Sequence, residues 1–482
     1  MMYKDLKFIF SFFLLFVGSI FCRSQNATPP QAATWTLQQC IDYALKNNLQ
    51  IKQNELNEEV TQATLLANKG KMLPNLNGNA SHSYNWGKSI NPYTNQFDNS
   101  EVQTDNFSLS SSITLFSGFQ NYNSVKQSQY DLLSSKYDVQ KQKNDISLNI
   151  ASDYLQILMN EELLQQSNDQ LSLISAQVKR TKILVDVGNL PKGNLLDIQA
   201  QEASEELSVT DAQNQLDISY LTLTQLLDLD SVGGFQIVKP ELSIPAETIL
   251  TSTPDQIYTK ALSSQPDIES AEMKLKSSET AVSIAKGGIS PRLILSGSIG
   301  SGYSNVANNV TGVNLTGYQP IGVTTTGVEV LGPTYQEITN IAPFSNQFND
   351  NVNKAIALQL TFPFFNGFQT KTTIEKAKIQ QLNNQYALEI TQNQFRKTIQ
   401  QAFADAKAAL KKYYSTLKNV TSLQEAFDYT QTKFNVGMVN SVDYDTSKNN
   451  LIKAKSNLLQ AKYDYIFKTK VLDFYEGKPL VF

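Results

Sequence analysis

The amino-acid sequence predicts a mainly helical protein with a small β part, built around two very long helices. Residues 119–187 and 368–436 contain neither glycine nor proline, so each segment can form one uninterrupted helix. At a rise of about 1.5 Å per residue, such a helix is roughly 100 Å long, whereas most globular helices have three or four turns. Directly before each long segment, residues 106–116 and 355–365 alternate between apolar and other side chains, which predicts strands.

The first long segment carries the apolar repeat of a coiled coil. Its apolar residues recur every seven positions, slip once by four and then resume, at Val125, Leu132, Val139, Ile146, Ile150, Ile157, Leu164, Leu171, Val178 and Val185. A seven-residue repeat predicts helices that supercoil around neighbours, and a slip of four locally unwinds the supercoil. The helices alone are equally compatible with a cytoskeletal or tethering rod.

The N-terminus indicates export. Lys4 and Lys7 precede an apolar stretch at residues 8–21, which is the pattern of a signal peptide over residues 1–24. Lipid attachment at Cys22 is the alternative, and the bulky Phe21 before it argues against that modification. Removal of the signal leaves Cys40 as the one cysteine, so the mature chain is not expected to form an intrachain disulfide.

Composition limits the classes of protein. The chain has 482 residues, 41% of them hydrophobic, and a formal net charge of −4. That length allows two or three domains, and the small net charge indicates no nucleic-acid partner. Beyond the N-terminus no apolar run reaches the ~20 residues of a membrane-spanning helix. We therefore expect a folded, exported protein that is stabilised by packing.

The first half, residues 25–230, is predicted to combine short helices, a β-hairpin and a pair of long helices. Thr36 and Gln39 form a capping box that opens the first helix, and Pro74 ends the second. Asn194, followed by Asp197, is predicted to cap the return helix. The other predicted elements are a hairpin at 75–116 with a polar loop at 87–103, a long helix at 119–187 and a return helix at 194–229.

The second half repeats this order after a predicted irregular linker at 231–253. Thr253 and Gln256 form a second capping box, and Pro291 matches Pro74 at an offset of 217 residues. The predicted elements of residues 254–482 are short helices, a hairpin at 291–365, a long helix at 368–436 and a return helix at 443–474. The later glycines match at an offset of 249, so the second hairpin has gained 32 residues around 302–350. This Gly-, Asn- and Thr-rich stretch predicts an extracellular loop within a duplicated architecture.

The strands have one apolar face that nothing else in the chain covers. Four strands cannot close on themselves, because even small barrels need about eight. An uncovered sheet with open edges aggregates unless neighbours complete it, so closure by several subunits is expected. In an exported protein, an apolar outer face and a Ser-, Thr- and Asn-rich inner face indicate an outer-membrane barrel. The alternative is a soluble sandwich that hides the apolar faces against each other.

The duplicated order of elements resembles the TolC-like outer-membrane efflux family. The residues that carry the resemblance are the junctions at 116–121 and 365–370 and the helix ends at 183–194 and 434–443. The resemblance covers essentially the whole mature chain, and the sequence at 35–45 is similar to Bacteroidetes-type members. It implies a homotrimer with a twelve-stranded barrel in the outer membrane and a tunnel of antiparallel coiled-coil helices in the periplasm.

The resemblance also implies functional residues. Family members close the periplasmic end with rings of carboxylates, which places the gate at Asp443 and Asp445, with Thr446 where the family has a second acid. A helix N-cap is the alternative role for Asp443. Strand–helix junctions are expected at Gly118 and Gly367. The expected contacts with an adaptor at the two tips are Gly188, Asn189, Leu190, Pro191, Lys192, Gly193, Asn194, Gly437, Met438, Val439, Asn440 and Ser441, where both Val-Gly glycines should be left-handed.

The sequence offers little for catalysis. His82 is the only histidine, so a conventional zinc or Cys/His site lacks ligands, and we expect no enzyme, metal or cofactor. A glycine-rich stretch at 297–302 is better explained as strand and loop, because no long helix follows it. Two functions remain open: an exit duct working with an inner-membrane transporter and a periplasmic membrane-fusion adaptor, or a periplasmic adaptor or tether without a pore.

Overall fold

The computed structural model describes residues 34–90, 97–229, 233–240 and 252–480, which form two compact units. Unit 1 includes the described parts of Met1–Ala44 and Asn149–Ile244, and unit 2 those of Leu45–Leu148 and Pro245–Leu480. The predicted signal peptide lies outside the described residues. The two units do not coincide with the two halves of the sequence, because strands and helices of the first half pack with those of the second.

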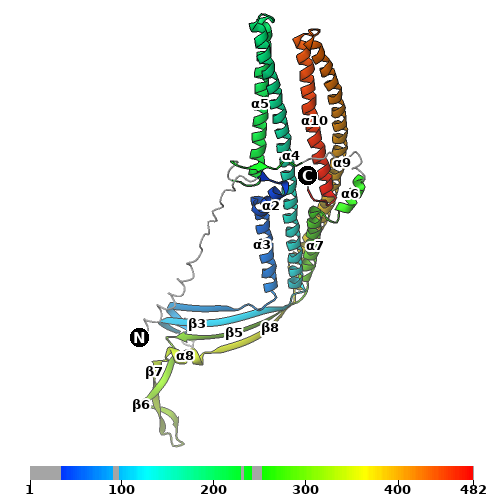
Figure 1. Ribbon diagram of the computed structural model, residues 1–482. Coiled ribbons are helices and arrows are strands. Elements are labelled where there is room, and N and C mark those ends of the chain that lie inside the picture. The colour runs from blue at the N-terminus through cyan, green and yellow to red at the C-terminus, as the bar shows by residue number, and fades with distance from the viewer. Residues whose placement is uncertain (1–33, 91–96, 230–232, 241–251, 481–482) are drawn as a thin grey trace. The chain divides into compact units, whose positions relative to one another are not determined.

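Unit 2 contains a four-stranded antiparallel sheet in the order β2-β3-β5-β8 (Figure 1). The strands are β2 (Asn77–Ile90), β3 (Phe97–Phe116), β5 (Arg292–Ser304) and β8 (Asn353–Thr361). The central pairing joins the two halves of the sequence: Leu109 lies opposite Ile299, and Ile113 opposite Leu295. β2 and β8 form the edges and have no outer neighbour among the described residues. The predicted alternation of apolar residues is confirmed up to Thr114 of β3 and up to Thr361 of β8. A bulge after Thr114 places Phe116 opposite Leu293, so the alternation predicted to continue through residue 115 is wrong there, and β8 ends before the predicted residue 365.

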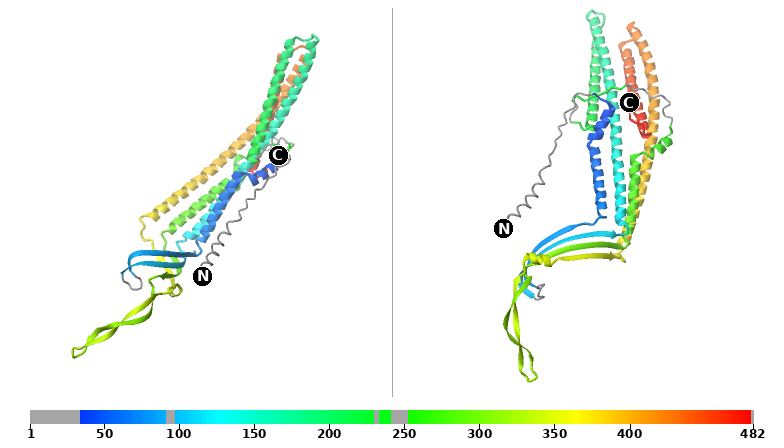
Figure 2. Two further views of the ribbon diagram at one scale, coloured as in Figure 1. Left: turned by 90° about the vertical axis from the view of Figure 1, so that its left-hand side faces the viewer. Right: turned by 60° about the horizontal axis from the view of Figure 1, so that its bottom comes forward.

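Four helices of unit 2 lie side by side in the same order as the strands they continue (Figure 2). They are α3 (Leu49–Gly70), the first part of α4 (Gln120–Asp186), α7 (Pro266–Gly287) and α9 (Gln369–Asn435). Polar contacts join neighbours along the row: Asn68 to Ser128, Ser134 to Ser270, and the Asn384 amide to the Lys274 carbonyl. Serines at the α4–α7 contact are small enough for the helices to approach closely, and Asp131 and Asp138 accept hydrogen bonds from Ser277 and Ser270, each at 2.6 Å.

The two long helices of the prediction are confirmed, since α4 and α9 each contain 67 residues. α9 packs along α10 (Ser441–Tyr475), and α6 (Pro254–Ala261) completes a core with Ile257, Ile268, Phe395, Ile399 and Leu472. Both predicted capping boxes are present. The Thr36 and Thr253 hydroxyls accept from Gln39 and Gln256 N–H, and the glutamine side chains accept in return.

Unit 1 combines the second part of α4 with α5 (Lys192–Leu226), α2 (Leu37–Asn47) and two short parallel strands. These strands are β1 (Thr34–Trp35) and β4 (Gln236–Ile237). Buried Tyr154 fixes them to the helix, because its hydroxyl donates to the Val238 carbonyl and lies 3.1 Å from that of Trp35. The prediction of an irregular linker at 231–253 is therefore wrong where β4 forms. A two-residue strand is too short for a visible sequence period.

Two predicted loops are regular structure instead. The polar loop expected at 87–103 is largely strand, since β2 extends to Ile90 and β3 begins at Phe97. Backbone pairing continues there although the side chains no longer alternate. The irregular loop expected around 302–350 contains β6 (Asn308–Val323), β7 (Glu329–Ile341) and α8 (Phe344–Asp350). Register shifts at three places in the β6–β7 pairing interrupt the period of two and hide these strands from sequence inspection.

A helix that crosses a membrane needs about 20 predominantly apolar residues. Within the described ranges, no helix is both long enough and apolar enough to cross a membrane.

Candidate functional site

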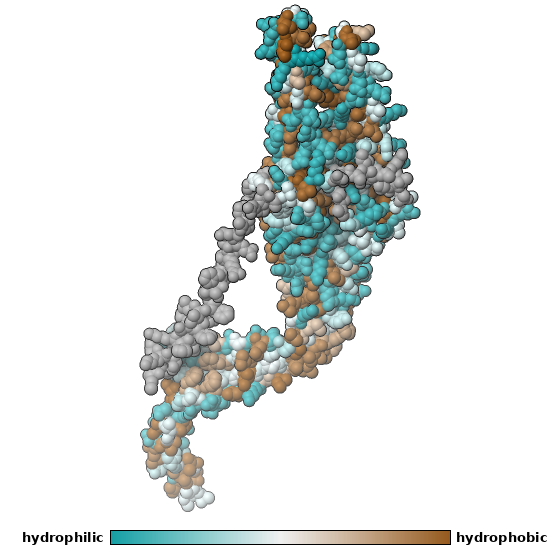
Figure 3. Space-filling view, in the orientation of Figure 1, coloured by the Kyte–Doolittle hydropathy of each residue, from teal (hydrophilic) through white to brown (hydrophobic). Residues whose placement is uncertain are grey.

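The two faces of the four-stranded sheet differ in chemistry. The apolar face carries Phe107, Leu109, Ile113, Leu293, Leu295, Ile299, Ile356, Leu358 and Leu360. The opposite face carries Ser108, Ser110, Ser112, Ser296, Ser298, Ala355, Ala357 and Gln359. The apolar side chains are uncovered: Ile356 is 86% exposed and Leu358 63%. Figure 3 shows apolar residues along the sheet. The arrangement suits lipid on one side and water on the other.

The apolar face has the height of a bilayer core. On β3 it extends from Phe107 to Phe116. At about 3.3 Å per residue and a tilt of about 40°, these ten residues cover roughly 25 Å, the usual height of an outer-membrane apolar band. At one end the face becomes polar, where His82 contacts Asp105 across the β2–β3 pair. This contact gives the one histidine a cross-strand partner.

Aromatic side chains lie at the other end of the band, where strands become helices. Phe116 packs edge-to-face on Phe119, and Phe365 does the same on Phe368. Gly118 and Gly367 occupy these junctions with φ of 62° and 64°, and the following phenylalanines are also left-handed. A side chain at Gly118 would meet the Gly287 carbonyl at 2.4 Å, whereas nothing lies within 4 Å at Gly367. The two junctions thus have the same backbone turn, but Gly118 is closely packed whereas Gly367 is not.

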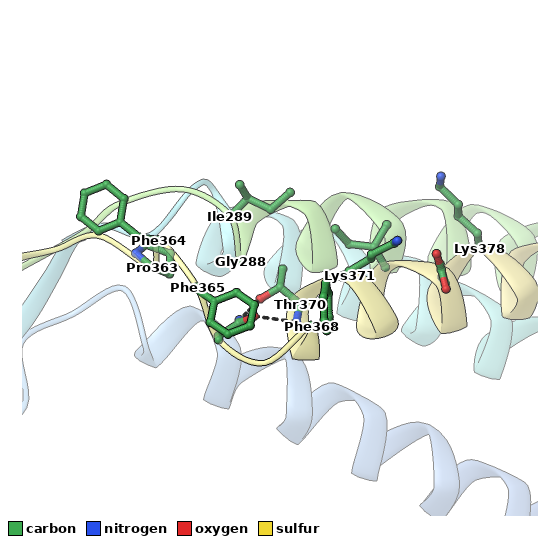
Figure 4. Close-up of a pocket in the computed structure, with 12 residues that line it drawn as sticks. Gly288, Ile289, Pro363, Phe364, Phe365, Phe368, Thr370, Lys371 and Lys378 are labelled. Carbon is green, nitrogen blue, oxygen red and sulfur yellow. Dashed lines mark hydrogen bonds between the residues drawn. The ribbon is translucent and has the colours of Figure 1, made fainter.

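A pocket of about 410 Å³ lies beside the second junction (Figure 4). Phe364, Phe365 and Phe368 line it together with Lys371 and Lys378 of α9. Aromatic rings next to lysines are typical of the membrane–water interface, where the rings contact acyl chains and the ammonium groups contact phosphates. The sequence predicted a strand–helix junction at 365–370 but no interfacial role for its phenylalanines and the nearby lysines, although the four phenylalanines at 362–368 were a visible signal.

The tip between α4 and α5, in unit 1, is a Schellman turn. Gly188 N–H donates to the Val185 carbonyl at 2.9 Å, and Asn189 N–H to the Leu184 carbonyl at 2.8 Å, with Gly188 at a φ of 78°. α5 begins at Lys192 after Pro191, which has no side chain that could cap it. The predicted cap at Asn194 and the predicted start of the helix there are therefore wrong. Proline supplies the required backbone angle instead.

The tip between α9 and α10, in unit 2, has the same turn. Gly437 N–H donates to the Phe434 carbonyl and Met438 N–H to the Lys433 carbonyl, and Gly437 has a φ of 76°. The buried Tyr444 ring stacks on Phe434 with centroids 4.6 Å apart, which fixes the two helices together. Val436, Met438 and Val442 stay exposed on this tip, and Ile183, Val187 and Leu196 on the first. Each tip thus combines a rigid backbone with exposed apolar side chains.

The three candidate gate residues lie in the first turns of α10. Asn440 is the N-cap, and its side chain accepts from Asp443 N–H at 2.8 Å. The alternative role of Asp443 as N-cap and the predicted helix start at residue 443 are therefore wrong, because Asn440 is the N-cap and α10 begins at Ser441. The Asp443 side chain is exposed and Asp445 is half-buried. Thr446 donates to the Val442 carbonyl within its own helix.

Metal binding and thiol chemistry are two further functions to consider for the described residues. In the part of the chain that the structure describes, no three His, Cys, Asp or Glu side chains come together as metal ligands. Burial raises the pKa of the Cys40 thiol to about 12, so this thiol stays protonated and unreactive.

Comparison with known proteins is consistent with this geometry. The sequence matches the family described as outer membrane efflux protein over residues 40–228 and 257–473. The outer membrane efflux protein BepC of Brucella suis biovar 1 is 19% identical over 92% of this chain and 86% of its own length. The outer membrane protein VceC from Vibrio cholerae has a TM-score of 0.73 at 14% identity, covering 92% of this chain and 97% of VceC. The Campylobacter jejuni CmeC outer membrane channel has a TM-score of 0.71 at 17% identity, covering 92% and 87%.

Proposed function

Because the chain belongs to the outer membrane efflux protein family, we propose that three copies form a passive exit duct for substrates delivered from the inner membrane. The protein is located in the outer membrane, with its helical tunnel in the periplasm. The single observation that carries the proposal is the four-stranded sheet, which has an apolar face, a polar face and two unpaired edges. Pairing β8 of one copy with β2 of the next would join three such sheets into twelve strands with a polar lumen.

The helices at the sheet edges support closure by the same neighbours. α3 leaves Leu49, Leu56 and Val60 exposed, and α9 leaves Ile379, Leu382, Tyr386 and Ile390 exposed. Each set recurs at helical spacing, and α3 and α9 are the outer helices of their row. An apolar stripe that no helix of its own chain covers is expected to pack on another chain. The proposed contact between copies therefore includes α9 of one protomer and α3 of the next.

The tips provide the proposed contact with a periplasmic membrane-fusion adaptor and, through it, an inner-membrane transporter. Their exposed apolar residues and rigid Schellman turns suit a repeated, shape-specific contact. We assign the gate to Asp443, Asp445 and Thr446, where three copies would converge. Carboxylates held close together repel, so the closed gate needs hydrogen bonds or bound cations, and its throat favours cations over anions.

An adaptor or tether without a pore is the alternative function. The β3–β5 pairing merges the strands of both halves into one sheet with an exposed apolar face of bilayer height. In a water-soluble tether such an apolar face would be exposed to water, which is unfavourable. No observation on the described residues favours this alternative.

Adjacent residues of β8 provide the test. Leu358→Arg places a charge on the apolar face, which costs up to ~2–4 kcal/mol near the middle of a bilayer. Gln359→Arg, on the polar face of the same strand, is the matched control. The proposal predicts that trimers in outer-membrane extracts decrease strongly for Leu358→Arg and remain for Gln359→Arg. Equal trimer yields from both variants would contradict the assignment of the faces.

A further inference from the structure

The pocket beside the second junction continues the apolar face of the sheet. It lies between the end of α7 and the start of α9, where Gly288 and Ile289 line it together with Phe364. Phe364 stacks on Phe362, which follows Leu360 of the apolar face at the strand spacing of two. Phe364 is 94% exposed and Ile289 64%. These uncovered side chains extend the apolar surface past the end of β8.

Two lysines lie where this apolar surface ends. Lys371 and Lys378 are about two turns apart on α9 and line the pocket with Glu375, so the lining has a net positive charge. Among the described residues, none of these three side chains forms an ion pair. Side chains of a helix lean toward its N-terminus, and Figure 4 shows Lys378 leaning back toward the junction. Both ammonium groups are therefore available to an anion at this level.

The combination of side chains matches a phospholipid. A phosphodiester would contact the two ammonium groups, while the acyl chains would lie on Phe364 and Ile289. A free phosphate would leave those apolar side chains in water. The pocket thus offers one contact for each end of a lipid molecule.

The pocket is separate from the contact proposed between copies. The Asn384 amide donates to the Lys274 carbonyl of α7, so Asn384 marks the side of α9 that faces α7. Leu382 and Tyr386 lie two positions before and after it and therefore point away from α7. The pocket, in contrast, is bordered by the end of α7 itself. A neighbouring copy that packs on Leu382 and Tyr386 would leave the pocket open to the membrane.

The charges of the lining favour an anionic headgroup. Two lysines attract a headgroup with a net negative charge, whereas a zwitterionic headgroup brings a cation of its own that the lysines repel. Glu375 acts in the opposite sense, because its carboxylate attracts such a cation. The lysines outnumber it, so the expected result is a preference for anionic lipid that depends on Lys371 and Lys378.

The duplicated architecture provides an internal comparison. At the offset of 249 residues, Lys371 and Lys378 match Tyr122 and Gln129 at the first junction. At the offset of 217, Gly288 matches Lys71, so a long side chain stands where the second junction has none. The two ammonium groups are therefore particular to the second junction.

The lysines near the first junction already have partners in their own chain. The Lys71 ammonium donates to the Asn68 side chain at 2.8 Å, and the Lys126 ammonium lies 6.0 Å from the centre of the Tyr130 ring. At the second junction, a β-carbon on Gly288 would lie 3.3 Å from the side-chain methyl group of Thr370. Glycine thus keeps the space between α7 and α9 open there.

We propose that this pocket binds an anionic phospholipid of the periplasmic leaflet, with the phosphodiester at Lys371 and Lys378 and the acyl chains along Phe364 and the apolar face of β8. The site goes beyond the proposed duct, because it requires only that the protein lies in the outer membrane. A bound lipid would hold the start of α9 at a fixed depth in the bilayer.

Lipid titration tests the site. Purified protein in detergent is titrated with phosphatidylglycerol or with phosphatidylcholine of the same acyl chains, and bound lipid is counted by native mass spectrometry. We expect tighter binding of phosphatidylglycerol, and a dissociation constant for it that rises about tenfold in the double variant Lys371→Gln, Lys378→Gln. The matched control is Lys411→Gln, Lys412→Gln, which removes two exposed lysines of α9 outside the pocket and should leave the constant unchanged.

A second variant tests the acyl contact. Phe364→Ser, at an exposed position, should weaken the binding of both lipids while the preference for phosphatidylglycerol remains. Inorganic phosphate and glycerol phosphate, added at millimolar concentration, should displace little of the bound lipid. Full displacement by either compound would show a site for soluble phosphate and overturn the lipid site.

The remaining outcomes also decide the matter. Equal affinity for the two lipids, or an equal loss of binding in both double variants, overturns the site. Trimers that retain no phosphatidylglycerol overturn the site and leave the duct standing. Monomers that bind phosphatidylglycerol through the two lysines support the site and contradict the duct.

Discussion

Asn440 is the N-cap of α10, and this separates capping from charge at the second tip. Its side chain accepts the hydrogen bond that a helix N-cap must accept, so Asp443 is left with an exposed carboxylate and no capping role. A change in conduction after neutralising Asp443 would then report its charge, because the cap remains. This separation of cap and charge makes the gate testable one residue at a time.

The double variant Asp443→Asn, Asp445→Asn tests the gate. Removing two carboxylates per protomer is expected to raise closed-state conductance, since the hydrogen bonds or bound cations that hold the closed gate together are lost. It is also expected to lower the preference for cations, since the throat loses its negative charge. Planar-bilayer recordings measure both quantities. Asn440→Ala is the control, expected to cost about 1 kcal/mol of helix stability through loss of the cap while cation preference stays. Unchanged selectivity and divalent block in the double variant would contradict the gate.

Asp153 gives unit 1 a pH-dependent stability. Burial raises the pKa of this carboxyl above its usual 3.8, in a polar groove of about 230 Å³ that Asn160 also lines. The folded state therefore binds the proton more tightly than the unfolded chain does. Its stabilising contribution is complete below the unfolded pKa and is lost as the pH rises through the folded pKa.

The variant Asp153→Asn should remove this dependence. We expect its melting temperature to exceed that of the unmodified protein at pH 7.5 and to approach it well below pH 3.8, where the native carboxyl is protonated in both states. Thermal unfolding followed by circular dichroism measures the difference. Asp211→Asn, at an exposed position of α5, should leave the melting temperature unchanged at both pH values. A lower melting temperature for Asp153→Asn at pH 7.5 would contradict the assignment.

Among the larger elements, the two strand–helix junctions form a natural comparison. Gly118 and Gly367 have the same left-handed backbone, so alanine at either position costs about 1–2 kcal/mol. Only Gly118 is also packed against the α7–β5 turn, at a distance that leaves no room for a methyl group. Gly118→Ala should therefore lower the melting temperature more than Gly367→Ala. Equal losses would show that the backbone angle alone explains both glycines.

Sequence periodicity predicted the elements with strong local signals. The 67-residue helices, both capping boxes and the apolar parity of β3, β5 and β8 follow from residue order alone. The β6–β7 hairpin was missed because its three register shifts break the alternation. The return helices begin two residues earlier than predicted, because Pro191 and Asn440 start them in place of Asn194 and Asp443. Several residues near the start of a helix can cap it, and their spacing in the sequence does not show which one does.

The sequence did not predict which distant strands and helices pair with one another. Adjacent hairpins predict β2 with β3, yet nothing in their composition predicts that β3 pairs with β5. The exposed stripes on α3 and α9 were equally hidden, because a coiled-coil pattern does not say whether its partner belongs to the same chain. The aromatic and lysine pocket at the second junction also needs three dimensions, since it combines the α7–β5 turn with the start of α9.

At the scale of the whole molecule, one chain presents surfaces that only an assembly can satisfy. Two open sheet edges, two apolar helix stripes and the apolar face of the sheet remain uncovered within the described residues. The proposed ring of copies would cover all of them, with lipid outside and polar side chains lining the passage.

The mass of the protein extracted from outer membranes tests this account most directly. Native mass spectrometry of detergent-solubilised protein should give a single species of three chains, released from membranes only by detergent and retained under mild dissociation. Three copies are expected because the proposed duct joins three four-stranded sheets into a twelve-stranded barrel with no open edge. A monomer, or any species released into the soluble fraction without detergent, would contradict the trimeric duct.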